Sequence, residues 1–160
     1  MSMHTQAGGK IRKAVVSLRG QTDSDVIFEV VRITGVASGS GSTTIIADAQ
    51  VPSNCRVRVL DWAITSNDVI WTSGGSDTVS IQDTSGTPIV FVTIAKASLP
   101  TATSGHTSVL GTSTKGQGLA TGGGLGKGIV FSRSATFAGA ALLTIELLVA
   151  IMPDTSITYA

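Results

Sequence analysis

The chain has 160 residues, one cysteine and a formal net charge of +1, and charged residues make up only 13% of it against 42% apolar residues. This length suits one domain with a substantial core, and one cysteine excludes an intrachain disulfide and a zinc site built on several cysteines. The charged share is about half that of an average soluble domain, so we expect exposed apolar surface and hence an oligomer or a component of a larger assembly.

The N-terminal part of the chain is basic. Four cations precede the first acidic residue, namely Lys10, Arg12, Lys13 and Arg19. A basic segment ahead of an acidic body can hold a neighbouring subunit or another acidic partner, and an exposed tail whose charges bind nothing is an equal alternative. The cluster is small and has no aromatic residues between its charges, so no nucleic acid is expected as a partner.

Short β-branched runs alternate with clusters of Gly, Ser, Thr, Asn and Pro along the whole chain, which predicts an all-β sandwich or barrel. KAVVSLRG and DVIFEVVRI are the first two expected strands, and the glycine-serine run ASGSGS follows them as a hinge. We therefore expect one β-sandwich domain over residues 42–160, preceded by an extended N-terminal arm over residues 1–41.

The stretch STTIIADAQVPSNCRVRVLDWAITSND predicts a strand, a VPSN turn and a second strand. Strict alternation places the odd-numbered residues from Cys55 to Ala63 on one face of the second strand, and the even-numbered residues from Arg56 to Ile64 on the other. Cys55 is expected to pack in the core and not to act as a nucleophile, because neither histidine shares a motif with it. Trp62 is expected in the core beside its apolar neighbours on the second face.

The second half of the chain predicts a hairpin and three further strands. DTVSIQDTSGTPIVFVTIAK is the hairpin, with DTSGTP as its turn, TSVL is a weak strand within a polar span, and GIVFSRS and AALLTIELLVAIMP close the chain. The last strand is apolar on both faces, so we expect one face in the core and the other against a neighbouring subunit. The residues expected to pack protomers together are Leu143, Ile145, Leu147 and Val149.

The apolar run over residues 137–152 does not predict a membrane helix. It is too short to cross a bilayer comfortably, and it contains Glu146. No membrane is therefore expected as a partner.

The segment LATGGGLGKGIVFS, residues 119–132, raises the question of a phosphate-binding loop. Such a loop needs G-x-x-x-x-G-K-[ST], and Gly126 and Lys127 supply its GK pair. Thr121 stands in place of the first glycine, however, and Gly128 replaces the hydroxyl residue that would hold magnesium. A strand-like IVFS follows in place of the helix that would complete the site. We interpret the segment as a mobile or close-packed connection.

The rest of the sequence shows no motif typical of a metal site or a catalytic site. The histidines and acidic residues show no metal-ligand spacing, and no G-x-S-x-G motif or close carboxylate pair appears. We expect no catalytic residue, no cofactor and no metal, and hence no enzyme. Trp71, beside TSGGSD, is a candidate for an exposed ligand contact or an interface anchor, with a core position as an even alternative.

Two stretches resemble segments of small virion proteins of tailed bacteriophages. TTIIADAQVPSNCRVRVLDWAI resembles their pattern of an apolar strand, a VP-containing turn and a strand of alternating valines. SRSATFAGAALLTIELLVAI is similar to their common ending, and the central hairpin also fits, so the resemblance spans residues 42–152.

The resemblance implies a jelly-roll-like β-sandwich that assembles as a trimer. It implies a capsid decoration, or cement, protein, made in the host cytoplasm, that binds the major capsid protein on the exterior of the virion. In that role the basic arm would reach neighbouring capsid subunits. The alternative is a tail or fibre module that recognises a host glycan through Trp71.

Overall fold

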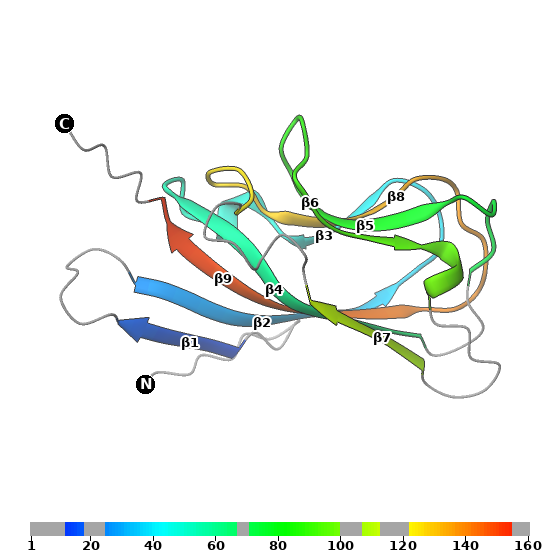
Figure 1. Cartoon of the computed structure of the whole chain (residues 1–160), viewed down its shortest axis with the longest axis horizontal. Coiled ribbons are helices and arrows are strands. Elements are labelled where there is room, and N and C mark those ends of the chain that lie inside the picture. The colour runs from blue at the N-terminus through cyan, green and yellow to red at the C-terminus, as the bar shows by residue number, and fades with distance from the viewer. Residues whose placement is uncertain (1–11, 18–24, 67–70, 100–106, 113–121, 155–160) are drawn as a thin grey trace.

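The computed structural model describes residues 12–17, 25–66, 71–99, 107–112 and 122–154. Within them, nine strands form two antiparallel sheets that pack face to face, in the orders β1-β2-β9-β4-β7 and β3-β8-β5-β6 (Figure 1). This part of the chain has two 3-10 turns, η1 (Asp48–Gln50) and η2 (Lys96–Ser98), and no α-helix. The strands are β1 (Arg12–Ser17), β2 (Asp25–Val36), β3 (Ser42–Ile46), β4 (Cys55–Ser66), β5 (Thr78–Asp83), β6 (Val90–Ala95), β7 (Thr107–Thr112), β8 (Ile129–Arg133) and β9 (Leu143–Pro153).

The strand pairing is nested. β2 pairs with β9, β3 with β8, β4 with β7 and β5 with β6, and successive pairs alternate between the two sheets. Nesting of this kind arises when one long antiparallel hairpin of four strand pairs rolls up on itself, which is the jelly-roll arrangement. β1 adds a further strand beside β2 at the edge of the larger sheet. The expected all-β, jelly-roll-like sandwich is confirmed.

β9 lies in the middle of the five-stranded sheet and fills the core with every second residue. The strand predicted there is confirmed, but the interface role of four of its residues is wrong. These side chains point between the two sheets with 0% of their surface exposed, so they pack one chain together and cannot reach a neighbouring protomer: Leu143, Ile145, Leu147 and Val149. The surface that β9 offers to a partner is made by its even-numbered residues.

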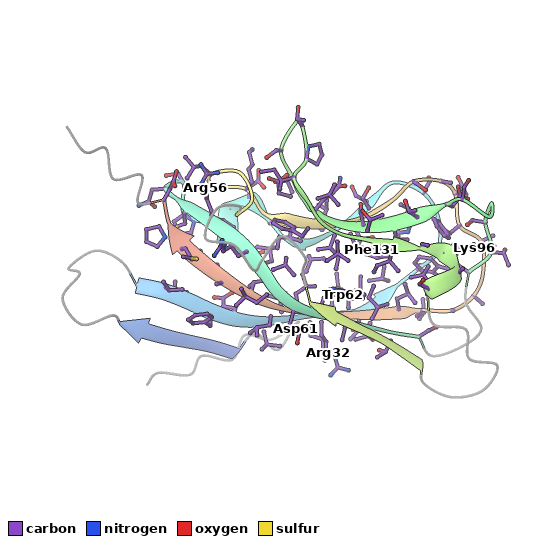
Figure 2. The ribbon with its side chains drawn as sticks, viewed as in Figure 1. Arg32, Arg56, Asp61, Trp62, Lys96 and Phe131 are labelled. Carbon is purple, nitrogen blue, oxygen red and sulfur yellow. The ribbon has the colours of Figure 1, made fainter. Side chains whose placement is uncertain are left out.

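A β-bulge divides β4 into two halves with opposite phase. Val57 and Val59 point into the core, the register against β9 shifts between Val59 and Asp61, and Trp62 and Ile64 then point inward. One extra residue in a strand moves all later side chains to the other face. The two faces predicted from strict alternation are therefore wrong beyond Val59. Figure 2 shows the outcome, with Trp62 between the layers and Asp61 on the outer side of the sheet.

The N-terminal strands belong to the sandwich. β2 pairs with β9 from Ile27 to Val36, and β1 pairs with β2, so the boundary expected after residue 41 does not separate an arm from a domain. The expected glycine-serine hinge is also tied down. Arg133 donates from Nη2 to the Ala37 carbonyl at 2.7 Å and from Nη1 to the Gly41 carbonyl at 3.3 Å.

Candidate functional site

The glycine loop that follows residue 121 is closely packed in its described part, residues 122–128. The Gly123 amide donates to the Val57 carbonyl at 2.8 Å, and the Gly126 amide donates to the Cys55 carbonyl at 2.9 Å. A Cβ built on Gly128 would lie 2.0 Å from the Ile46 carbonyl oxygen, so only glycine fits there. Of the two alternatives left by the sequence, a mobile or a close-packed connection, the structure shows the second.

Asp83, at the end of β5, is the buried anchor of this loop, with 1% of its surface exposed. Its Oδ1 accepts hydrogen bonds from the amides of Ser85 at 3.2 Å and Ile89 at 2.8 Å, and its Oδ2 accepts from the Ser85 hydroxyl at 2.9 Å and the Gly124 amide at 2.7 Å. Burial raises the pKa of Asp83, but these hydrogen bonds outweigh it and leave the pKa below its ordinary value. The carboxylate joins the β5–β6 hairpin loop to the glycine loop.

Asp48 in η1 holds the other side of the glycine loop. Its carboxylate accepts hydrogen bonds from the Thr84 hydroxyl and from the Gly128 amide at 2.8 Å, and it forms an ion pair with Lys127 at 3.1 Å. These hydrogen bonds, that of Thr84 first, lower the pKa of Asp48 to about 2. The chain's own carboxylates therefore engage the groups that a bound phosphate would need: the lysine and two of the glycine amides.

Trp71 is not a surface residue. It has 0% exposed surface, its Nε1 donates to the Ala141 carbonyl at 2.7 Å, and its ring packs edge-on against Phe131 and at a tilt against Phe137. The Arg133 guanidinium lies 5.2 Å from its ring centroid, which adds a cation–π contact. Of the two alternatives for Trp71, the core position is confirmed and the exposed ligand contact is wrong, because its ring is fully buried in this aromatic cluster.

The outer face of the five-stranded sheet carries the apolar surface that the composition predicts. Val30 of β2 and Leu148 of β9 are paired across the ladder and are 40% and 37% exposed. A shallow pocket of about 240 Å³ lies between these two residues, Ala63 and Glu146. The sequence predicted a second apolar face on this last strand, but the residues assigned to it, Leu143, Ile145, Leu147 and Val149, belong to the core face, and the even-numbered residues form the outer one.

Of the four cations expected to contact a partner, two lie in β1. Arg12 stands opposite Val30 and Lys13 opposite Glu29 in the ladder, whereas Lys10 and Arg19 lie outside the described residues. The structure thus places Arg12 in the same row as the exposed Val30, at the edge of the larger sheet.

Cys55 is buried, as expected, and burial raises the pKa of its thiol. In the part of the chain that the structure describes, no three His, Cys, Asp or Glu side chains cluster as a metal would require. The same part contains no helix long and apolar enough to span a membrane.

No protein-family model matches the chain, and no curated protein matches it. Among solved structures, the chain is similar to one from the Cyanophage Pam1 capsid asymmetric unit, with 16% sequence identity and a TM-score of 0.36. That likeness covers 88% of this chain and 94% of the other. A likeness of this size does not indicate the function of the chain.

Proposed function

We propose that the chain is a structural protein of a tailed-phage virion, a decoration or cement protein that binds the outside of the head between major capsid subunits and stabilises the shell. The jelly-roll sandwich and the resemblance over residues 42–152 support this role. The alternative role is a tail or fibre module that binds a host glycan through Trp71. It is not supported, because Trp71 is buried and cannot contact a glycan.

The observation that carries the proposal is that polar side chains bond to the chain's own loops, whereas large apolar side chains are exposed. Asp48 and Asp83 brace loops, and Arg133 ties down backbone carbonyls. In contrast, four large apolar side chains of the described part are exposed to solvent: Val30, Leu125, Leu142 and Leu148. Polar groups that hold loops, together with exposed apolar side chains on the surface, are typical of a structural component.

The end of the sandwich that carries the glycine loop is the capsid-binding surface in this proposal. The β5–β6 hairpin loop projects there from the smaller sheet (Figure 1), and the glycine loop beside it presents Leu125, which is 44% exposed. Asp83 joins the two loops through hydrogen bonds. Loops that are already ordered lose little conformational entropy on binding, so a modest contact suffices.

The basic residues complete the proposed contact. Lys10, Arg12, Lys13 and Arg19 would face an acidic surface of the neighbouring capsid subunit. Repetition over the shell would add avidity to each contact. Self-association of the chain, as a trimer according to the resemblance, belongs to the same proposal, but the four core residues of β9 take no part in it.

The direct test mixes the purified full chain with heads of its own phage that lack it. We expect co-sedimentation with the heads and a higher temperature of capsid disruption. Leu125→Asp should weaken binding at least tenfold, whereas Thr93→Asp, which puts the same charge at an exposed position on β6, should not. Heads that neither bind the chain nor gain heat resistance would refute the proposed function, and full binding by Leu125→Asp would refute the proposed surface.

A further inference from the structure

We propose that the outer face of the five-stranded sheet binds the same face of a second copy of this chain, about a two-fold axis that runs across the strands. This inference does not require capsid binding, but it differs from the trimer that the resemblance implies, so the oligomeric state of the chain distinguishes the two.

The centre of that face is an apolar strip on two neighbouring strands. A sheet face that meets water normally carries polar side chains, but the outward pairs Phe28–Ala150 and Val30–Leu148 of β2 and β9 are apolar, and the charged pair Arg32–Glu146 follows them in the ladder. Val30 and Leu148 are the most exposed of them. The strip consists of Val26, Phe28, Val30, Leu148, Ala150 and Met152.

Two adjacent rows of residues across this face are complementary in charge and in size. In the first row, Arg58 of β4 and Phe28 of β2 flank Ala150 of β9. In the second row, Asp61 of β4 and Val30 of β2 flank Leu148 of β9. The bulge in β4 creates this match, because it turns Asp61 to the same face as Arg58.

A two-fold axis between these rows lays each row over the other row of the partner. Arg58 then faces Asp61 twice, once on each side of the interface. Leu148 faces Ala150, so a large exposed side chain meets a small one that is 2% exposed between its flanking neighbours. A two-fold contact requires this self-complementarity, in which one residue meets a second and the second meets the first.

The face is also large enough. At about 3.3 Å per residue and about 4.8 Å between strands, the three long strands and two short ones cover roughly 700 Å² in projection. A standard specific interface buries about 600–1,000 Å² per partner, a range that includes this area, and sheets stack face to face at about 10 Å. In this arrangement Met152 comes opposite the pocket between Leu148 and Glu146.

The charges on this face favour a second copy over other partners. Both signs occur side by side, since Arg32 and Glu146 form an ion pair at 3.1 Å within a few residues of Arg58 and Asp61. A nucleic acid or an anionic membrane surface would require an excess of positive charge. A mixed surface suits a partner that carries the same mixture.

The test is the mass of the full chain in solution, measured by sedimentation velocity over a range of concentrations. The wild type should sediment as two copies of the 16.2 kDa chain, or as a multiple of two if a second contact also forms. Leu148→Arg should raise the dissociation constant at least a hundredfold, and the matched control Thr93→Arg, on the outer face of the other sheet, should leave it unchanged.

Charge reversal makes the test specific and does not depend on the apolar variant being folded. Arg58→Asp and Asp61→Arg should each weaken the pair at least tenfold, and the double variant should recover to within a few-fold of the wild type. A wild type that is monomeric or purely trimeric would overturn the inference, as would a mass that Leu148→Arg leaves unchanged or a double variant no better than either single one. A wild-type chain that binds heads but does not pair in solution would overturn the pairing inference and leave the capsid proposal standing.

Discussion

Replacing Asp83 with asparagine tests whether one buried carboxylate holds the hairpin loop and the glycine loop together. Its two oxygens accept four hydrogen bonds, from the amides of Ser85, Ile89 and Gly124 and from the Ser85 hydroxyl. Asparagine keeps the shape of the side chain but has a single acceptor oxygen. In either orientation of the new amide, at least one backbone N–H then faces another donor.

The expected loss follows from that unpaired amide. A buried donor without a partner costs about 1–3 kcal/mol, and a hydrogen bond to a charged group contributes about 1.5–3 kcal/mol. Since both figures describe the same amide, we expect Asp83→Asn to lower the free energy of unfolding by about 2–3 kcal/mol. At about 2–4 °C per kcal/mol for a chain of this size, the Tm falls by about 4–12 °C.

Calorimetry or circular dichroism measures this loss, and Asp77→Asn serves as the control. It makes the same chemical change at the half-buried carboxylate near the other end of β5 and should cost about 0.5 kcal/mol or less. Equal destabilisation by the two variants at neutral pH would refute the role of Asp83 as an anchor.

The pH dependence gives a second check. Because the native pKa of Asp83 lies below 3.8, its contribution to stability is present above that pH and is lost as the pH falls through the native pKa. The difference between wild type and Asp83→Asn should therefore be widest near neutral pH and should narrow on acidification. A difference that widens in acid would contradict the reasoning.

Three further outcomes are expected. Gly128→Ala should lower the free energy of unfolding, measured in urea, by about 3 kcal/mol or more, because its Cβ would overlap the Ile46 backbone. The control Gly86→Ala, in open space, should change it by about 0.5 kcal/mol at most. Equal effects of the two variants would contradict the close packing of the glycine loop. Trp71→Ala should cost about 3–5 kcal/mol in the same assay, and wild-type stability in this variant would show that the ring is not in the core. Cys55 should react with a thiol reagent only after unfolding, since burial raises its pKa; rapid modification of the native chain would contradict this.

The strands and their class could be predicted from the sequence because a β-strand has a local signature. Each strand expected from residue 13 onward is present, including the weak TSVL segment, which lies within β7. The alternation of apolar and polar residues did not determine which face of each strand points into the core. Alternation gives a period of two but does not say which face is inside, and the bulge after Val59 reverses the faces of β4 without any local signal.

The candidate site was harder to predict because long-range packing decides it. Trp71 stands beside a polar TSGGSD segment and reads as exposed, yet Phe131, Phe137 and the Ala141 carbonyl enclose it. All three lie at least 60 residues further along the chain. In the glycine loop the sequence excluded a phosphate-binding motif, but Asp48 and Asp83, which engage its amides, could be found only from the structure.

The two outer faces of the sandwich differ in a way that the proposed pairing explains. On the four-stranded sheet, one row across all four strands consists of hydroxyl residues, namely Ser42, Ser132, Ser80 and Thr93. The corresponding centre of the five-stranded sheet is apolar, with Leu148 paired to Val30. If two copies pair through their five-stranded sheets, both hydroxyl-bearing faces remain exposed to solvent and both apolar strips become buried. The hydrophobic effect favours this arrangement. The glycine-loop ends stay at the sides of such a pair, where each remains accessible to a capsid subunit.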